Sequence, residues 1–524
     1  MRWRVAAAVS VLTSLVLLAV CVVAEAGDEK RALFNLDLKL VDAGAAGAGQ
    51  NLTGPPSGPL PLSLADSIAI AVKNNLDISI EGYNPRLREQ DLISAKAVFD
   101  PSAFMELNYG NNRFPTTLNF FLAQGLNQSA FANTNAGIRE ILPTGGTFEL
   151  RYNTLIMHPG FNTDNQDFAS RPVLTLTQPL LRNFGLDANE TNIKIAMGNR
   201  AIAQEQLRLR VSNVTIQTYN AYVELIYANE YLQVQRRSLQ LARDLVTLNT
   251  ARVRAGVAAP VEVTQAEAQQ AAQVQNVILA EKSVQDAQDN LKVILNVPGS
   301  GGSWAQEIRP TYTLKFEAQT VNLDAAIQAA FENRYEYKSA KLDLENKGVS
   351  LRLARNQLLP DLAFSGTVSS NGVGSTYGGV TNQIGSGNYV GYTVGVILTV
   401  PLGNRAANAK YTSAELTLEQ SRTALKSLEL QIVQQVREGV RRVEADAKRV
   451  DANRAATVLA EEQLRVEQRR LEAGVSTTFN VLQFQTQLAT AQANEIRAIA
   501  DYYEALSNLD SVRGTVLQTY KIEM

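Results

Sequence analysis

One stretch occurs twice in this chain and constrains the fold more than any other feature. The first copy covers residues 181–297 and the second covers residues 402–514. Each follows a strand-like segment that ends in a proline, Pro179 or Pro401. Each then continues without proline, because none lies between Pro179 and Pro260 and none follows Pro401. Since proline breaks the interior of a helix, the two runs predict two very long helices.

Both runs carry a seven-residue repeat of apolar positions, which is typical of coiled-coil packing. The repeat consists of Leu225, Leu232, Leu239, Val246 and Val253 in the first run, and of Val436, Val443, Val450, Thr457, Leu464 and Leu471 in the second. A helix over 189–254, about 66 residues, would span about 100 Å at ~1.5 Å per residue. A compact globular core does not need such a helix, although a coiled-coil or filament protein would also fit this pattern.

Each long run ends at a matching turn, Arg254–Val257 or Glu472–Val475, in which a glycine follows the helix. The chain then returns through a shorter apolar-periodic segment, 261–296 or 479–512, which is roughly half the length of its partner. The helices expected before the strands supply the missing half. We therefore expect each half of the chain to contain one long helix beside two shorter, stacked ones.

An internal repeat supports this division, because residues 64–71 resemble residues 323–330 and Pro101 corresponds to Pro360. Repeat 1 is predicted over 62–297 and repeat 2 over 323–514. Their parts, in order, are helices 62–99, strands 101–180 and hairpin 181–297, then helices 323–359, strands 360–401 and hairpin 402–514. A connector over 298–322 is expected to form a belt at mid-height, and residues 515–524 form a C-terminal tail.

Strands are predicted after both of these prolines from alternation of apolar residues with small or polar ones, as in Phe148, Leu150 and Tyr152. The pattern indicates four strands in the first half and two in the second, with an additional hairpin near 134–155 that turns at 141–146. The segments 111–133 and 370–388 are rich in Gly, Asn and Ser and are expected to be loops. Alternation of this kind fits a transmembrane barrel, and it also fits a half-buried soluble sheet. An open sheet edge in lipid is costly, so a barrel would have to close with further copies of the chain.

The N-terminus has the layout of a secretory signal peptide over 1–26, followed by a flexible leader rich in Ala, Gly and Pro over 27–61. Cys21 is the one cysteine, and whether it carries a lipid is left open. No later apolar run reaches the ~18 residues that a membrane helix needs, so a membrane crossing would use strands.

The composition gives no indication of catalysis. The net charge of −2 provides no basic footprint for nucleic acid. The one histidine, His158, is expected in a loop between strands and cannot build a His/Cys metal site alone. The segment Gly372–Ser375 is glycine-rich, but we expect a loop there without a following helix. We therefore predict no enzyme and no cofactor.

The order of elements and the paired turns resemble the outer-membrane efflux protein family of TolC-like trimeric channels. The local signatures are Ala255-Gly256-Val257 with Val261-Glu262-Val263, and Ala473-Gly474-Val475 with Phe479-Asn480-Val481-Leu482. The resemblance covers 62–514. It implies a mainly α-helical homotrimer whose strands form a β-barrel in the outer membrane and whose hairpins form a tunnel through the periplasm.

The resemblance also implies a function and its sites. The chain would be the passive exit duct of a tripartite efflux or type I secretion system, opened when a periplasmic adaptor docks at the hairpin tips and supplied by an inner-membrane pump of RND or ABC type. The docking residues would be Arg254, Gly256, Val257, Glu472, Gly474 and Val475. The periplasmic aperture would be lined by Asn480, Gln483 and Glu262. The first two replace aspartates of the family's best-known member, so a charged ring is lost there. A scaffold that conducts nothing is the alternative.

Overall fold

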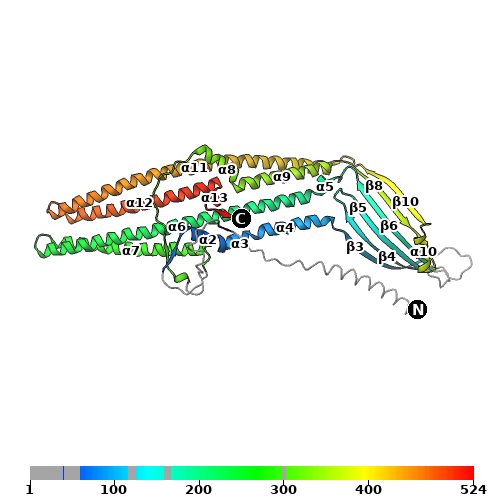
Figure 1. Cartoon of the computed structure of the whole chain (residues 1–524), viewed down its shortest axis with the longest axis horizontal. Helices are drawn as coiled ribbons and strands as arrows, with labels where there is room; N and C mark the ends of the chain where they lie inside the picture. Colours follow the sequence, from blue (N-terminus) through cyan, green and yellow to red (C-terminus); the bar gives the residue numbers. More distant parts are fainter. Residues whose placement is uncertain (1–38, 41–58, 116–125, 159–166, 298–302) are drawn as a thin grey trace, which may run out of the picture. The chain divides into compact units, whose positions relative to one another are not determined.

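Two long helices, α6 (Thr191–Arg254) and α11 (Arg405–Glu472), organise the fold (Figure 1). The computed structural model describes residues 39–40, 59–115, 126–158, 167–297 and 303–524, so the signal peptide, Cys21 and most of the leader lie outside the described residues. The chain divides into two units, Leu40–Ile522 and Met1–Lys39 with Glu523–Met524. Both long helices belong to the unit Leu40–Ile522.

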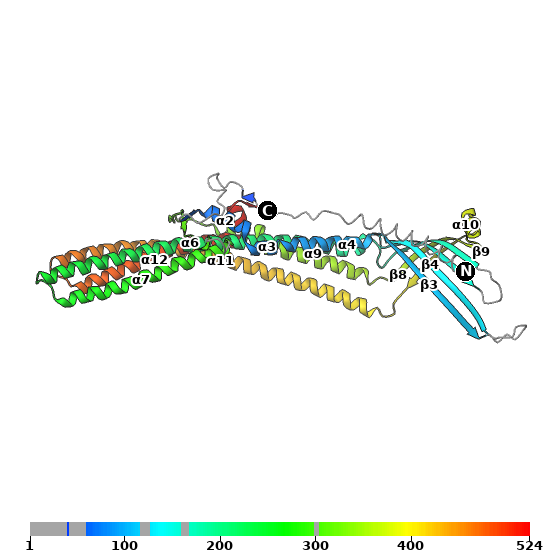
Figure 2. The ribbon, with the colours of Figure 1, turned by 90° about the horizontal axis from the view of Figure 1, so that it is seen from below.

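Each long helix returns through a shorter one after a tight turn. α6 is followed by α7 (Pro260–Ile294), and α11 is followed by α12 (Thr478–Arg513). The two hairpins lie side by side, and their turns lie at the end of the helices opposite the strands (Figures 1 and 2). The predicted arms are confirmed, because the heptad residues Leu225, Val443 and Val450 are fully buried between these helices.

The other half of each long helix packs against the helices that precede the strands. α6 contacts α2 (Leu64–Asn74), α3 (Leu76–Glu81) and α4 (Tyr83–Lys96), which is followed by η2 (Ala97–Phe99). α11 contacts α8 (Leu323–Asn333) and α9 (Tyr335–Asn356). The predicted arrangement of one long helix beside shorter, stacked ones is therefore confirmed in both halves.

The strands form one antiparallel sheet that both halves share. Its order is β10-β8-β6-β5-β4-β3, with β9 paired to β6. The strands are β3 (Ser102–Pro115), β4 (Leu126–Ile141), β5 (Thr147–His158), β6 (Asp167–Pro179), β8 (Asp361–Ser370), β9 (Gly372–Gly374) and β10 (Val390–Thr399). The pairing of β6 with β8, in which Leu174 lies opposite Val368, joins the two halves.

The connector between the halves is held by hydrogen bonds to the helices. Its strand β7 (Ile308–Pro310) pairs in parallel with β2 (Leu60–Leu62), and η3 (Ser303–Ala305) precedes it. The hydroxyl of Tyr222 in α6 accepts from the Tyr312 amide of the connector at 3.4 Å and donates to the Leu62 carbonyl of β2 at 2.8 Å. Burial raises the pKa of that hydroxyl. Further along, the hydroxyl of Tyr502 donates to the carbonyl of Glu317 at 3.0 Å. The short elements α5 (Leu186–Asn189), α13 (Val516–Thr519), β1 (Lys39–Leu40) and β11 (Ile522–Glu523) complete the chain.

Several sequence predictions were wrong in detail. The leader does not stay unstructured to residue 61, because Leu60 and Pro61 belong to β2 and pair with Ile308 and Arg309 of the connector. The segment 111–133 is not all loop, since β3 continues to Pro115 and β4 begins at Leu126. His158 is the last residue of β5 and not a loop residue.

A helix does follow the glycine-rich segment near 372, contrary to the prediction for 370–388. This helix, α10 (Tyr377–Ser386), begins where the Thr376 side chain accepts a hydrogen bond from the Gly379 amide. Val380 of this helix is fully buried, and a Cβ at Gly372 in β9 would lie 2.6 Å from the Val380 carbonyl oxygen. Packing on β9 therefore supplies the stability that this glycine-rich sequence lacks on its own.

Candidate functional sites at the hairpin tips and on the sheet

The two hairpin tips have the same backbone geometry. At the first tip the amide of Val257 donates to the carbonyl of Arg252 at 3.0 Å, and the amide of Gly256 donates to that of Val253 at 3.0 Å. This is the hydrogen-bond pattern of a Schellman C-cap. It recurs at the second tip, where Val475 donates to Arg470 at 2.9 Å and Gly474 donates to Leu471 at 3.1 Å.

Glycine is required at both tips by conformation and not by space. Gly256 has φ of +75° and Gly474 has φ of +77°, in the left-handed region that side chains disfavour. No atom lies within 4 Å of the position that a Cβ would take at either residue. The sequence motif therefore identified two positions at which the backbone angle, and not the space available, decides the residue type.

All six predicted docking residues are exposed at these tips. The side chains of Val257 and Val475 are each 66% exposed. Two further apolar residues, Val261 at 57% and Phe479 at 63% exposed, lie in the first turns of α7 and α12. Sequence reasoning did not select them as docking residues, although both stand in the sequence motifs of the tips. Exposed apolar side chains gathered at a turn are typical of a protein contact.

The second tip contains a carboxylate that is tied to the turn. Glu467, whose side chain is 5% exposed, accepts a hydrogen bond from the Ser476 hydroxyl and pairs with Arg470 at 3.1 Å. The hydroxyl of Ser476 in turn accepts a hydrogen bond from Nδ2 of the Asn480 side chain at 3.3 Å. The hydrogen bond from Ser476, followed by the charge of Arg470, lowers the pKa of Glu467. Of the predicted aperture residues, Asn480 is thus half-buried against its own turn, whereas Gln483 is exposed.

A buried polar cluster joins the two tips. The Thr478 hydroxyl donates to Oε2 of Glu262 at 2.7 Å and accepts from Nδ2 of Asn249 at 3.1 Å. Nδ2 of Asn249 also donates to the Glu262 carbonyl at 3.1 Å. Asn249 and Thr478 are fully buried, and Glu262 is half-buried. The structure therefore brings Glu262 of the first tip to the start of α12, beside the second tip.

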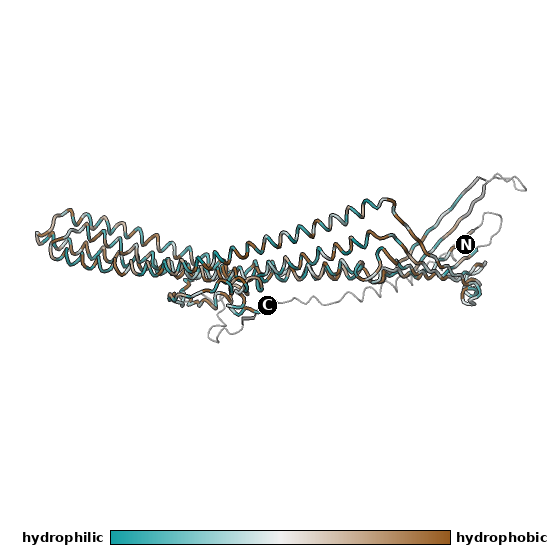
Figure 3. The backbone as a smooth tube through the Cα atoms, turned by 90° about the horizontal axis from the view of Figure 1, so that it is seen from above, coloured by the Kyte–Doolittle hydropathy of each residue, from teal (hydrophilic) through white to brown (hydrophobic). Residues whose placement is uncertain are grey.

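The sheet has one predominantly apolar face. The register places apolar side chains from all six long strands on it: Met105, Leu107 and Tyr109; Ile138; Leu150 and Tyr152; Leu174 and Leu176; Leu362, Phe364 and Val368; Tyr392, Val394, Val396 and Leu398. Polar residues on the same face include Thr134, Glu140, Thr154, Ser170 and Gln178. Many are exposed, for example Tyr392 at 81% and Leu107 at 62%. Hydrophobic and hydrophilic residues alternate along the strands (Figure 3). Such a face is suited to lipid.

The opposite face of the sheet is predominantly polar. It carries Glu106 and Asn108; Asn133, Asn135 and Arg139; Glu149, Arg151 and Asn153; Arg171, Thr175 and Thr177; Ser365, Thr367 and Ser369; and Thr393 and Thr399. The apolar residues that interrupt it are Phe104, Phe131, Ile141, Leu155, Met157, Val173 and Ile397. Hydrogen bonds cross the strands on this face, as from Asn153 to Oδ1 of Asn133 at 2.9 Å. A polar face of this kind is suited to water.

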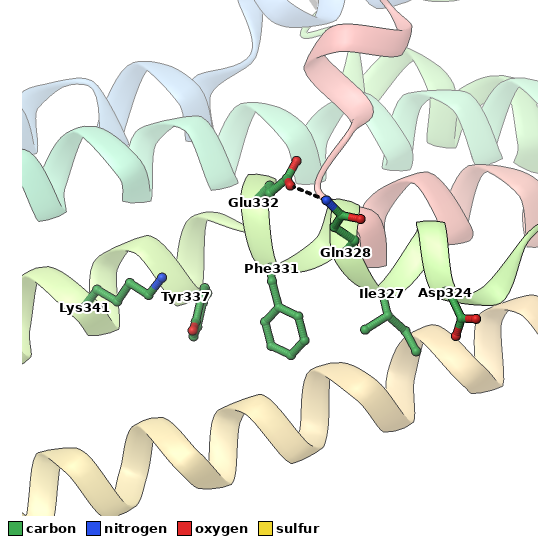
Figure 4. A pocket seen from close by; sticks show the side chains of 7 residues that line it. All are labelled: Asp324, Ile327, Gln328, Phe331, Glu332, Tyr337 and Lys341. Atoms are coloured by element: carbon green, nitrogen blue, oxygen red, sulfur yellow. Dashed lines mark hydrogen bonds between the residues drawn. The ribbon is translucent and has the colours of Figure 1, made fainter.

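A hollow lies far from both tips, between the α8–α9 junction and α11 (Figure 4). Phe331 and Tyr337 pack edge to face within it, with ring centroids 5.4 Å apart. The Tyr337 hydroxyl donates to Oε1 of Glu429 at 3.0 Å, and the Lys341 ammonium lies 4.1 Å from the Tyr337 ring centroid. The hydrogen bond from Tyr337 to Glu429 joins α9 to α11, and the contact of Phe331 with Tyr337 joins α8 to α9, so we assign the hollow a packing role.

Within the described ranges, no group of three or more His, Cys, Asp or Glu side chains could hold a metal ion. In the same part of the chain, no helix is long and apolar enough to cross a membrane.

Two long helical hairpins joined to a sheet with one apolar face define the class of protein. It combines a coiled coil with strands suited to a membrane. The model of the family "Outer membrane efflux protein" matches residues 163–297 and 326–515. The chain belongs to the outer membrane efflux protein family. Its members are efflux channels of the outer membrane and not enzymes.

Individual relatives are distant. Nodulation protein T of Rhizobium leguminosarum bv. trifolii is 22% identical over 56% of this chain, and the match spans 62% of that protein. Outer membrane protein TolC of Vibrio cholerae is 24% identical over 68% of this chain and 81% of its own length. Outer membrane efflux protein BepC of Brucella suis is 22% identical over 92% of this chain and 91% of its own length.

Solved structures share the fold. The outer membrane protein VceC of Vibrio cholerae superposes with a TM-score of 0.62 at 16% identity, covering 86% of this chain and 96% of that chain. The outer-membrane channel OprN superposes with a TM-score of 0.64 at 12% identity, covering 86% and 89%. At these identities the likeness concerns the fold alone.

Proposed function

We propose that the chain is the passive exit duct of a tripartite efflux or type I secretion system. Three copies would close their sheets into a barrel in the outer membrane, and their hairpins would form a tunnel in the periplasm. The observation that carries this proposal is the sheet, whose apolar face suits lipid and whose polar face suits a water-filled lumen.

The two tandem repeats, 62–297 and 323–514, would then each supply a share of the barrel and a hairpin of the tunnel. The connector 298–322 would encircle the tunnel at mid-height. Residues 1–26 would direct export and be removed. The energy would come from an inner-membrane pump, of RND or ABC type.

The hairpin tips are the proposed docking site for a periplasmic adaptor. Arg254, Gly256 and Val257 of the first tip, and Glu472, Gly474 and Val475 of the second, are exposed in the same backbone geometry. The exposed Val261 and Phe479 extend this apolar surface. An adaptor that contacts both tips would favour the splayed state of the tunnel. We place the periplasmic aperture at Asn480, Gln483 and Glu262.

Fractionation and conductance test the proposal. The chain should sediment with outer membranes, run as a heat-labile trimer in SDS gels and conduct in planar bilayers. A non-conducting coiled-coil scaffold would remain soluble, or would insert without conductance, and either result would refute the exit duct.

A further inference from the structure

The sheet ends in two strand edges that no described strand covers. β3 pairs only with β4, and β10 pairs only with β8. In lipid, each unpaired backbone group of these edges would cost several kcal/mol. The described part of the chain does not shield β10 from lipid, because Tyr392 and Val394 on its apolar face are 81% and 65% exposed. Both edges therefore need partners.

The direction of the strands decides what those partners can be. Each neighbour along the path from β10 to β3 is antiparallel to the last, and the path contains an even number of strands. β3 and β10 consequently run in opposite directions. When a second copy lies edge to edge with the first and the same face is outward, its β3 is antiparallel to β10 of the first. The antiparallel order continues across the seam without interruption.

The two faces of the sheet restrict the register of this seam. Met105, Leu107 and Tyr109 of β3 must lie on the same side as Val394, Val396 and Leu398 of β10. A slip of one residue would turn the apolar residues of one strand into the lumen. Only alternate registers are therefore allowed.

We propose that three copies close through β10–β3 seams into an eighteen-stranded barrel, to which each copy contributes the six long strands of its sheet path. This inference rests on the proposed function and adds the strand number and the bore to it. The family match begins at residue 163, after β3, β4 and β5. In repeat 2, two long strands, β8 and β10, stand between the short helices and the long hairpin. Repeat 1 has four long strands in the corresponding place, and the hairpin β4–β5 is the pair that repeat 2 lacks.

This hairpin is an integral part of the wall and not a flap. Its turn at 142–146 is bound to the segment that links β6 to α6. The Gly185 amide donates to the Thr144 carbonyl at 3.1 Å, and the Thr144 hydroxyl donates to Oε1 of Gln178 at 2.8 Å. Gly145 approaches this segment so closely that a Cβ would lie 2.2 Å from the Asn183 carbonyl oxygen.

The additional hairpin changes the bore. With strands ~4.8 Å apart and tilted by ~40°, eighteen strands close into a barrel about 36 Å across, against about 24 Å for the twelve that would remain without β4–β5. After side chains are allowed for, an eighteen-stranded wall leaves an open aqueous channel. We therefore infer that the barrel admits cargo of larger cross-section than a twelve-stranded barrel would.

Cysteine pairs test the seam. Cys21 is the one native cysteine, so the parent chain serves as the control. Leu107→Cys combined in one chain with Val394→Cys, Val396→Cys or Leu398→Cys should give, for at least one pair, disulfide-linked trimers that are separated by reduction. Leu107→Cys with Thr393→Cys, on the opposite face of β10, should give none. Trimers that cross-link only through Thr393→Cys, or through none of these pairs, would overturn the proposed seam.

Deleting residues 116–158 tests the strand number. The deletion removes β4 and β5 and leaves β3 antiparallel to β6, so a twelve-stranded barrel can still close. The largest neutral polymer that enters from the outer face should be smaller in diameter by at least about one third relative to the parent chain, because side chains narrow both barrels by the same width. An unchanged exclusion limit would refute the inference.

Direct imaging of the parent trimer in nanodiscs counts the strands even if the deletion variant does not assemble. Twelve strands in a conducting trimer would overturn this inference and leave the exit duct intact. A parent chain that neither forms trimers nor conducts would refute both.

Discussion

At two positions of the hairpin tips, the backbone conformation decides which residue type is tolerated. Gly256 and Gly474 adopt positive φ in otherwise open space. The motif was visible in the sequence because only a turn of this kind places glycine directly after a long helix. The cluster of Glu467 with Ser476 was not visible, since these residues meet only after the turn has formed. The same holds for Thr478, which reads as an ordinary helix start and is fully buried against Asn249.

Replacing either tip glycine by alanine should destabilise the protein by about 1 kcal/mol, because alanine is strained at positive φ. Thermal or denaturant unfolding of Gly256→Ala and Gly474→Ala measures this. Gly348→Ala is the matched control, since Gly348 lies inside α9 with open space around its Cβ position. There the same change should stabilise the helix by roughly 0.5–1 kcal/mol. A loss of stability at Gly348 equal to that at the tips would contradict the explanation.

Glu467 should make stability depend on pH in the acid range. Its folded pKa lies below the ordinary value of 4.5, so its carboxylate stabilises the fold above that value. The contribution is lost as the pH falls through the lowered pKa. In Glu467→Gln the contribution is absent at every pH. The difference in free energy of unfolding between parent and variant should therefore be constant above about pH 5 and shrink on acidification. A difference that grows on acidification would be the wrong sign.

At the scale of elements, periodicity predicted what local pattern can encode. The long arms were placed within a few residues of α6 and α11, because a heptad repeat sustained this far has one interpretation. β2 and α10 were missed because neither is encoded locally. β2 depends on pairing with β7, far along the chain, and α10 holds several glycines and depends on the burial of Val380. The additional hairpin was recognised from its turn residues, although its strands extend further than the alternation indicated.

The turn of that hairpin offers a comparison between two glycines with nearly equal φ, +89° at Gly145 and +91° at Gly185. A Cβ at Gly145 would collide with the Asn183 carbonyl, whereas at Gly185 no atom lies within 4 Å. Gly185→Ala should cost about 1 kcal/mol from conformation alone. Gly145→Ala should cost roughly 1–3 kcal/mol more, as for other small-to-large changes at packed sites. Equal effects in unfolding experiments would show that the turn is not packed against its neighbours.

At the scale of the whole molecule, the sequence indicated a sheet that cannot close alone, but not its register. The order β10-β8-β6-β5-β4-β3 depends on a pairing between the two halves, β6 with β8, that no local pattern specifies. The proposed aperture would likewise be a property of the assembled trimer. Residue types at 480 and 483 can be read from the sequence, whereas their spacing across three copies cannot.

Neutral amides at positions 480 and 483 leave Glu262 as the one carboxylate among the proposed aperture residues, so the channel should be less readily blocked by multivalent cations. Asn480→Asp combined with Gln483→Asp restores two carboxylates per copy, so block should set in at a roughly tenfold lower concentration, about 1.4 kcal/mol tighter. Single-channel recording with a trivalent cation measures this. The exchange Asn480→Gln with Gln483→Asn keeps two neutral amides and should behave like the parent. Equal half-blocking concentrations for the parent and the aspartate variant would contradict the assignment.

The tight turn at 142–146 has a consequence for how such a wall can change over evolutionary time. A duplicated or lost β-hairpin alters each polypeptide by two strands, and a three-fold assembly multiplies that change to six. An odd insertion would set neighbouring subunits parallel where they meet and would interrupt the antiparallel order. The diameter of such a barrel would therefore change in steps of six strands during evolution and not gradually. The gain or loss of one hairpin in the gene would be enough for one step.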